Sequence, residues 1–426
     1  MCVMVSKQLF AGHRCSTRSL RRGCLVLSVV AVLAGFSAHR APISGPPHRV
    51  VLISLDGFRW DYLQRPAARH LRHLAARGVR AERLVPSFPS KTFPNHYTLV
   101  TGLYPENHGI AANVMRDSLL GRFATGNDPA VRDARWFRGE PIWVTAETQG
   151  VRSASYFWPG SEAPIGGIRP HWFFPFNVTT TRAERVEQVL GWLSMPDSTA
   201  PRLITVYFGD VDTEGHNYGP ESPQTDSAIA RVDSVVGAIV EGIAQLGDAD
   251  LIDVIVVSDH GMAAVASDRA IALDDYVSMD SLDIGDWSPV ATIIPKPGCE
   301  AYVYRALAGV NPHLQVFRKG ELPDRLHYNS GEHVTPIVAI ADEGWSIGTR
   351  SMLATMERGH VYGAHGYDNA TLSMGALFIA AGPDFKVGVT VPAFANVHAY
   401  SLLAELLGLR PAVTDGTLDS VRVLLR

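Results

Sequence analysis

The sequence predicts an α/β fold with a doubly wound, mostly parallel sheet flanked by helices. Two observations lead to this prediction. Short apolar runs rich in β-branched residues recur along the chain and are typical of buried strands. Longer stretches with helical periodicity separate them. This alternation is typical of sheets covered by helices on both faces, and such sheets bind ligands beyond the carboxyl ends of their strands.

The elements are expected in the following order. Strands are predicted at residues 50–55, 203–208, 252–257 and 376–380, and helices at 66–77, 181–193, 222–246 and 397–406. Residues 267–355 break this alternation. Short β-like pieces at 290–294, 301–305 and 337–341 lie there among Gly, Pro and polar residues. We expect this stretch to form a smaller inserted cap packed near the site.

The N-terminal region differs from the rest in composition. No acidic residue precedes Asp56, and five Lys or Arg residues precede an apolar run at 25–36. Residues 1–41 are therefore predicted to be a secretory signal peptide, with an uncleaved anchor as the alternative. Residues 42–426 would then form one catalytic domain. The protein is expected to be exported, to the periplasm or outside the cell, and to meet a membrane only through an uncleaved N-terminal segment.

Composition excludes several classes of protein. A chain with 46% hydrophobic and 19% charged residues is globular rather than disordered. The net charge is −4, and removing the six Lys and Arg of residues 1–41 would take it to −10. Binding to duplex nucleic acid is therefore not expected. Three of the four cysteines lie before residue 25, which leaves only Cys299 and no internal disulfide.

Carboxylates and imidazoles follow three of the expected strands, and one more imidazole lies in a motif at 363–369. Together they make a mixed oxygen and nitrogen ligand set, which suits zinc better than magnesium or calcium. Six such residues could serve two metals, which would stabilise the attacking and leaving oxygens of a phosphoryl transfer. Any one of them alone could be a helix cap or a surface residue. The six are Asp56, Asp212, His216, Asp259, His260 and His365.

A nucleophile is available in the segment 86–96, which holds Ser87, Ser90 and Thr92. Thr92 lies just before Phe93-Pro94, and Pro favours the first turn of a helix. The Thr92 hydroxyl would then lie at a helix N-terminus, which favours an anion. A metal ion beside it would lower the pKa of the hydroxyl. A plain helix cap is the alternative that the spacing leaves open.

Five motifs in this order resemble the nucleotide pyrophosphatase/phosphodiesterase family of the alkaline phosphatase superfamily. The resemblance runs from about residue 50 to 385. It implies an alkaline phosphatase-like fold, and the chain is similar to a compact bacterial-type member, because it has no room for the extra domains of vertebrate members. The motifs are the segments 91–97, 101–110 with Asn113, 212–220, 258–262 and 365–369.

The resemblance implies two zinc ions and a covalent phosphothreonine intermediate on Thr92. The Phe93 N–H and the Asn113 side-chain amide would bind a phosphoryl oxygen. Nucleotide phosphodiester and phosphoanhydride substrates would release nucleoside 5′-monophosphates. The ligands would be Asp56, Thr92, Asp259 and His260 for one zinc, and Asp212, His216 and His365 for the other.

Substrate binding is expected to involve two aromatic residues. Phe93 follows the nucleophile, and Phe176 is the candidate for the facing side of the base. Relatives often carry Tyr there, so Phe176 would stack without offering a hydroxyl. Ordinary core packing is the alternative for both. The segment 158–162 resembles a stretch that lines the substrate pocket in the family.

Enzymes with other activities use the same set of metal-ligand residues. A phosphomonoesterase would want more cations around its dianionic phosphoryl group, and Lys91 is the only cation next to Thr92 in the sequence. A choline-phosphodiester or lysophospholipid phosphodiesterase would differ only in the pocket. A sulfatase is disfavoured, because its Cys/Ser-x-Pro-x-Arg signature is absent. A non-catalytic binding protein should have lost a metal-ligand residue or the nucleophile, whereas all six metal-ligand residues and Thr92 are present.

Overall fold

The computed structural model describes residues 48–126, 129–247 and 249–426. The predicted signal peptide or anchor at 1–41 lies outside the described residues. Within those residues, no helix combines the length and the apolar character needed to cross a bilayer.

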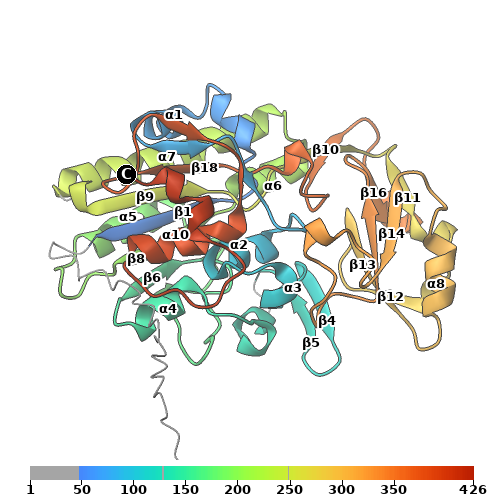
Figure 1. Cartoon of the computed structure of the whole chain (residues 1–426). Helices are drawn as coiled ribbons and strands as arrows, with labels where there is room; N and C mark the ends of the chain where they lie inside the picture. The colour runs from blue at the N-terminus through green and yellow to red at the C-terminus, as the bar shows by residue number, and fades with distance from the viewer. Residues whose placement is uncertain (1–47, 127–128, 248) are drawn as a thin grey trace, which may run out of the picture. The chain divides into compact units, whose positions relative to one another are not determined.

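An eight-stranded sheet forms the centre of the molecule (Figure 1). The strand β1 (Arg49–Leu55) lies between β9 (Ile252–Val257) and β8 (Leu203–Phe208) and is parallel to both. The order is β19-β2-β18-β9-β1-β8-β6-β7, and β18 is antiparallel to both of its neighbours. The other strands of this sheet are β2 (Val79–Ala81), β6 (Ser153–Tyr156), β7 (Trp172–Phe174), β18 (Phe378–Ala381) and β19 (Val389–Val391).

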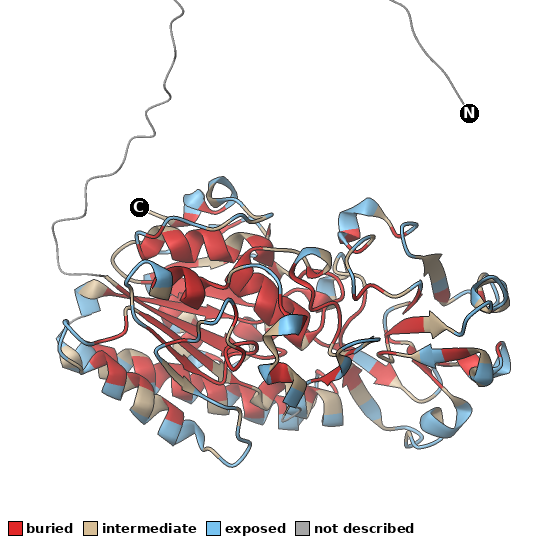
Figure 2. Cartoon of the chain, turned by 90° about the horizontal axis from the view of Figure 1, so that it is seen from below, coloured by how far each residue is buried: buried red, intermediate tan, exposed pale blue. Residues whose placement is uncertain are grey.

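Helices cover both faces of this sheet, because both faces of its central strands are apolar. In β1, Val51 and Ile53 belong to a core shared with α1, α5 and α7, whereas Val50 and Leu52 belong to a core shared with α2, α4 and α10. Figure 2 shows the central strands as buried and the outer surfaces of the helices as exposed. The helices are α1 (Arg69–Arg77), α2 (Thr92–Thr101), α4 (Ile142–Thr148), α5 (Arg182–Leu193), α7 (Pro223–Leu246) and α10 (Ala399–Leu406).

The predicted fold class is confirmed. The four expected strands form, and the last of them, β18, is the antiparallel one. The expected helices form with small shifts of their first residues. Helix α5 begins where Thr181 and Glu184 make a capping box, and Ser222 is the N-cap of α7, where its hydroxyl accepts a hydrogen bond from the Thr225 N–H.

A second, smaller sheet of four strands lies in the stretch that breaks the alternation. Its order is β12-β13-β15-β14, and it has its own apolar core. The expected β-like piece at 301–305 is wrong, because these residues lie in the helix α8 (Glu300–Leu307). Val303 and Leu307, one turn apart, are fully buried while Tyr302 is exposed, which is a helical period. The strands are β12 (Leu282–Ile284), β13 (Val290–Pro295), β14 (Leu314–Arg318) and β15 (Ile337–Ala341).

Short elements connect the two sheets and complete the unit. The antiparallel ribbon of β10 (Ala263–Ala266) and β17 (Val361–Ala364) leads from the large sheet toward the small one. Helix α6 (Asp210–Tyr218) follows β8. The remaining elements are α3 (Pro105–His108), α9 (Arg350–Leu353), β3 (Leu84–Val85), β4 (Val114–Asp117), β5 (Gly121–Ala124), β11 (Ala270–Ala272), β16 (Ser346–Gly348) and β20 (Phe394–Ala395).

Candidate active site

Three neighbouring parallel strands bring the acidic side chains of the site together. Asp56 directly follows β1, and Asp259 comes two residues after β9. Asp212 and His216 lie one turn apart on α6, which follows β8, so both project from the same helix face. Because β9, β1 and β8 are adjacent and parallel, these groups converge at one edge of the sheet.

Two glycines permit the close approach of the elements that carry these residues. Gly57 has φ +67°, and a Cβ there would lie 2.8 Å from the Asp212 Cα. A Cβ on Gly363, within β17, would lie 2.3 Å from the Gly215 carbonyl oxygen. A side chain at either position would therefore force α6 away from the site.

Three histidines of the site share one orientation. In each ring, Nδ1 lies within hydrogen-bond distance of a backbone carbonyl oxygen, which can only accept, so Nδ1 carries the proton. The Nε2 lone pair is then free to bind a metal, an arrangement typical of zinc-binding histidines. The pairs are His216 with Gly363 at 2.8 Å, His260 with Gly261 at 2.9 Å, and His365 with Ser90 at 2.8 Å.

The Nε2 atoms of His216 and His365 lie 3.0 Å apart. The Asp212 Oδ1 atom lies 3.4 Å from the first and 3.5 Å from the second, and it is buried with no hydrogen-bond partner among the described residues. Two lone pairs and a carboxylate oxygen facing one point are unfavourable without a cation between them. This donor set fits a metal ion such as zinc.

A second set of ligand atoms adjoins the first. His260 Nε2 lies 2.9 Å from Asp259 Oδ2, 3.5 Å from Asp56 Oδ1 and 3.3 Å from Thr92 Oγ1. Both of those carboxylate oxygens are buried and lack a hydrogen-bond partner among the described residues. The His260 ring also stacks on His365 at 3.5 Å between centroids, so the two sets share one site. These residues fit a second metal ion.

The electrostatics of the site reflect burial of several charges together. Burial, with the charges of Asp259 and Asp212, raises the pKa of Asp56 well above its usual range. Burial and the neighbouring imidazoles of His260 and His216 lower the pKa of His365 well below its usual value. A neutral His365 is the form that binds a metal, and a bound cation would offset the repulsion between the carboxylates.

Thr92 is the first residue of α2, and Lys91 occupies the N-cap position. The Thr92 hydroxyl therefore does not occupy the N-cap and lies beside His260 instead. Asn113 accepts a hydrogen bond from the Phe93 N–H at 2.9 Å through its Oδ1 atom. The two groups expected to bind a phosphoryl oxygen are thus bonded to each other in this structure, which leaves the Asn113 Nδ2 donors for a ligand.

A cavity of ≈ 350 Å³ opens beside Thr92 and contains both expected aromatic residues. Phe93 packs edge-on against Phe123, with 5.4 Å between centroids. The Phe176 N–H donates to Glu162 Oε1 at 3.0 Å, which holds Phe176 at the wall of the cavity. Other residues that line this cavity are Phe157, Trp158, Pro159, Gly160 and Tyr207.

Several residues of the site carry no clear signal in the sequence. Tyr207 lies inside β8 and donates from its hydroxyl to Asp56 Oδ2 at 2.6 Å. Phe157 lines the cavity with φ +67°, a conformation that is strained for an aromatic residue. His96 is fully buried, with Nδ1 2.9 Å from the Thr92 carbonyl oxygen and Nε2 2.7 Å from Ser54 Oγ. Only its position in the motif around Thr92 hinted at His96.

The sheet topology and these two sets of ligand atoms beside one hydroxyl define a hydrolase of the alkaline phosphatase superfamily. Residues 50–368 match the family described as type I phosphodiesterase / nucleotide pyrophosphatase. The chain belongs to this family.

Relatives match over most of the chain. An uncharacterized pyrophosphatase/phosphodiesterase of Schizosaccharomyces pombe is 37% identical over 95% of this chain and 87% of its own length. Human bis(5′-adenosyl)-triphosphatase ENPP4 is 36% identical over 94% of this chain and 86% of its own. The structure of murine ENPP5, as an inactive threonine-to-alanine variant in complex with AMP, has a TM-score of 0.84 at 37% identity and covers 89% of this chain and 100% of its own.

Proposed function

We propose that this protein is a two-zinc enzyme that hydrolyses nucleotide phosphodiester and phosphoanhydride bonds and releases nucleoside 5′-monophosphates. The main support is the pair of adjoining sets of metal-ligand atoms, one of which places His260 Nε2 3.3 Å from the Thr92 hydroxyl, next to an aromatic cavity. The AMP complex of the inactive threonine-to-alanine variant of murine ENPP5 adds support for both the nucleophile and the bound nucleotide.

The ligand residues would hold the metals in two groups. Bound zinc would lower the pKa of the Thr92 hydroxyl and offset negative charge on the phosphoryl oxygens. The mixed carboxylate and imidazole donors fit zinc, and the histidine tautomers present Nε2 to it. The groups are Asp56, Thr92, Asp259 and His260, and Asp212, His216 and His365.

The Thr92 hydroxyl would lose its proton to solvent, and its Oγ1 would attack the phosphorus in line and form a phosphothreonine ester, while the bond to the leaving oxygen breaks and that oxygen departs with the electron pair. Asn113 would donate from Nδ2 to a non-bridging oxygen, and the N-terminus of α2 favours the negative charge there. Water then attacks the phosphothreonine. Its oxygen remains on the released nucleoside monophosphate, and a proton returns to Thr92 Oγ1.

The cavity walls are suited to a nucleoside. Phe93 and Phe176 would contact the base, which presents a flat apolar surface to aromatic rings. A phosphomonoesterase is less well supported, because the Lys91 ammonium is paired with Asp286 at 2.8 Å. Lys91 is therefore not an uncommitted cation for a dianionic phosphoryl group.

The test compares kcat/KM for three substrates of the zinc-loaded enzyme. They are the p-nitrophenyl ester of thymidine 5′-monophosphate, p-nitrophenyl phosphate and p-nitrophenyl phosphorylcholine. We expect a preference of more than about tenfold for the nucleotide ester, since base stacking contributes about 1–3 kcal/mol. Preference for the monoester or the choline ester would assign the enzyme to those activities instead.

Thr92→Ala and Thr92→Ser test the nucleophile. The alanine variant should lose turnover while keeping its fold and most of its metal affinity, because the other six ligand residues remain. The serine variant keeps a hydroxyl at this position and should retain measurable activity, with a nucleoside monophosphate trapped on the substituted side chain by acid quench. Activity of Thr92→Ala near that of the wild type would overturn the assignment.

We also propose export of the protein, on the basis of the N-terminal composition. Fractionation of cells that express the full chain, with N-terminal sequencing of the product, tests this proposal. Retention in the cytosol with an intact N-terminus would contradict it.

A further inference from the structure

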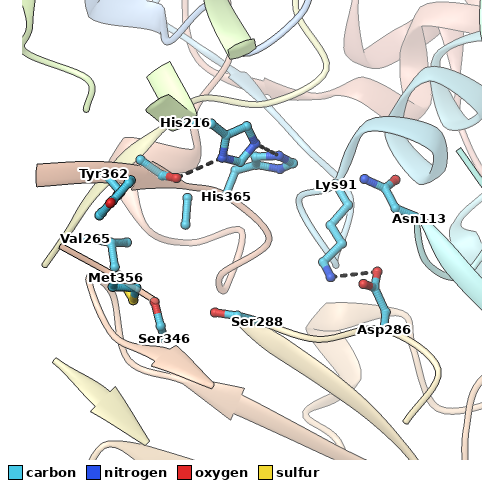
Figure 3. A pocket seen from close by; sticks show the side chains of 12 residues that line it. Lys91, Asn113, His216, Val265, Asp286, Ser288, Ser346, Met356, Tyr362 and His365 are labelled. Carbon is cyan, nitrogen blue, oxygen red and sulfur yellow. Dashed lines mark hydrogen bonds and ion pairs between the residues drawn. The ribbon is translucent and has the colours of Figure 1, made fainter. Parts of the chain in front are cut away.

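Two hollows lie along α1 and α7, which pack side by side on one face of the large sheet (Figure 1). The cavity drawn in Figure 3 belongs to the site already described, because His216 and His365 line it. None of the described residues that line the two hollows belongs to that site. The two hollows are therefore separate from the chemistry at Thr92.

The larger hollow, of ≈ 540 Å³, is strongly basic. Three arginines and one glutamate line it, which gives a formal charge of +2 in a chain whose net charge is −4. Two histidines, His70 and His73, add imidazoles to the same wall. A basic hollow on an acidic protein attracts anions. The arginines are Arg69, Arg72 and Arg77, and the glutamate is Glu241.

Three of these basic side chains form one row along α1. Arg69, His73 and Arg77 follow one another at four-residue intervals, which places them on one helix face about 6 Å apart. All three are exposed, and none of their side chains has a hydrogen bond or an ion pair with another described residue. Arg72 differs, because its guanidinium donates to backbone carbonyl oxygens of the preceding turn. The row is therefore available to a ligand.

Contacts on the inner side of α1 hold this row in place. Asp233 of α7 accepts hydrogen bonds from the His70 and Leu71 N–H groups at 2.9 and 2.8 Å, which fixes the first turn of α1. A Cβ on Gly237 would lie 2.6 Å from His70 Nδ1, so the glycine lets the two helices approach. A fixed helix keeps the spacing of its basic residues when a ligand binds.

The basic hollow continues beyond Arg77. A second hollow, of ≈ 400 Å³, shares Leu74, Arg77 and Val240 with the first, so the two form one groove, the α1–α7 groove. Its other charged lining residues are Arg426 and Asp250. An elongated groove beside a row of basic side chains fits a linear chain of anionic groups better than a single phosphate.

The lining residues distinguish between kinds of linear anion. No Phe, Tyr or Trp is among the described residues that line the groove, whereas single-stranded nucleic acids are held by stacked aromatic rings. Within their described lengths, α1 and α7 expose no large hydrophobic residue, whereas helices that bind bilayers insert such residues. Protein interfaces also use aromatic and apolar anchors. A hydrophilic chain with repeated sulfate or carboxylate groups needs no such anchors.

We infer that the α1–α7 groove binds an acidic polysaccharide. The guanidinium groups of Arg69 and Arg77 would donate to sulfate or carboxylate oxygens, with His73 between them. This inference does not depend on the proposed function, since the groove and the aromatic cavity share no described lining residue. Binding there would hold the protein on a polysaccharide and leave the active site open.

Calorimetric titration of the full chain with two octasaccharides tests the inference. Heparin supplies sulfate groups and hyaluronan supplies carboxylates alone, so the tighter ligand identifies the preferred anion. The double variant Arg69→Gln/Arg77→Gln should weaken binding about tenfold or more, because each pair of exposed charges in contact contributes several-fold to affinity. Its melting temperature should stay close to that of the wild type, since neither guanidinium has a partner among the described residues.

The matched control is Arg358→Gln/Arg410→Gln. These two arginines are exposed and lie outside the groove, and their loss changes the net charge by the same amount. The control should change affinity less than about twofold. Equal weakening by both double variants would overturn the inference, because it would indicate a response to net charge alone. Absence of binding to both octasaccharides at low salt would overturn it as well, and so would binding to phosphatidylglycerol vesicles in their place.

Discussion

His216 and His365 bring their Nε2 atoms to 3.0 Å from each other while both rings donate from Nδ1 to backbone carbonyls. Neither ring can relieve this contact by rotating without breaking its hydrogen bond. The contact therefore identifies a place where a cation is needed, and Asp212 lies within 3.5 Å to share it.

Removal of bound metal should inactivate the enzyme and lower its melting temperature, because the facing imidazoles and carboxylates would lose the charge that holds them together. Dialysis against a chelator, followed by calorimetry and measurement of metal content, checks this prediction. Zn²⁺ should restore both activity and melting temperature. Restoration by Mg²⁺ and not by Zn²⁺ would contradict the zinc assignment.

Tyr207→Phe should reduce zinc affinity and kcat/KM by about 10- to 100-fold, the usual effect of losing a hydrogen bond to a metal ligand. The Tyr207 hydroxyl donates to Asp56 Oδ2 at 2.6 Å and so orients Oδ1 toward His260. Competition with a chromophoric chelator measures the affinity. Tyr302→Phe, in the exposed part of α8, is the control and should have no effect. Unchanged zinc affinity in Tyr207→Phe would show that Asp56 needs no such support.

Phe176→Leu should lower kcat/KM for the p-nitrophenyl ester of thymidine 5′-monophosphate about tenfold and leave hydrolysis of bis(p-nitrophenyl) phosphate, which has no base, nearly unchanged. The control is Phe174→Leu, two residues earlier on β7, because Phe174 stacks on Tyr156 outside the cavity. An equal loss with both substrates would indicate that Phe176 serves packing and not recognition of the base.

Much of the site could be predicted because its residues follow strands. Asp56, Asp212 and Asp259 each come after a short apolar run, and parallel neighbours end at the same edge of a sheet. The fold class followed from the same alternation of runs and helices. The local pattern of residues does not reveal which strands are neighbours in the sheet. These three carboxylates lie together because the strand order is β9-β1-β8.

Other features depend on contacts between distant segments. Tyr302, Val303 and Tyr304 all favour strands locally, yet packing of Val303 and Leu307 selects a helix. The Lys91–Asp286 pair joins residues 195 positions apart, and each is an ordinary charged residue in the sequence. Pairing of this kind is visible only once the chain is folded.

Breaking the Lys91–Asp286 pair should lower the free energy of unfolding by about 3–5 kcal/mol, because the remaining charge stays buried without a partner. The two side chains are 5% and 14% exposed. Urea unfolding of Lys91→Met, Asp286→Asn and the double variant measures the effect. The double variant should lose less free energy of unfolding than the two single variants lose in sum.

The pair between Lys296 and Asp283 is the control for this measurement. Asp283 lies in β12 and Lys296 directly follows β13, and these two side chains are 50% and 45% exposed. Solvent screens such a pair, so Lys296→Met should lower the free energy of unfolding by less than about 1 kcal/mol. Similar losses for the two pairs would show that burial does not determine their contributions.

Asp253 should make stability depend on pH. It is fully buried at the start of β9, and burial together with the neighbouring Asp384 raises its pKa to about 8. In the unfolded chain this carboxyl ionises near its ordinary value of 3.8. Between these two values the folded state therefore holds an extra proton, and raising the pH lowers the free energy of unfolding.

Asp253→Asn removes this titration, so its stability relative to the wild type should increase steadily from about pH 4 to pH 8. Urea unfolding at several pH values within this interval measures the difference. Asp250→Asn, at an exposed position three residues earlier, should parallel the wild type throughout. If Asp253→Asn also paralleled the wild type, the Asp253 carboxyl would have to ionise at the same pH in the folded and unfolded chains, and its burial beside Asp384 would have no effect on its proton.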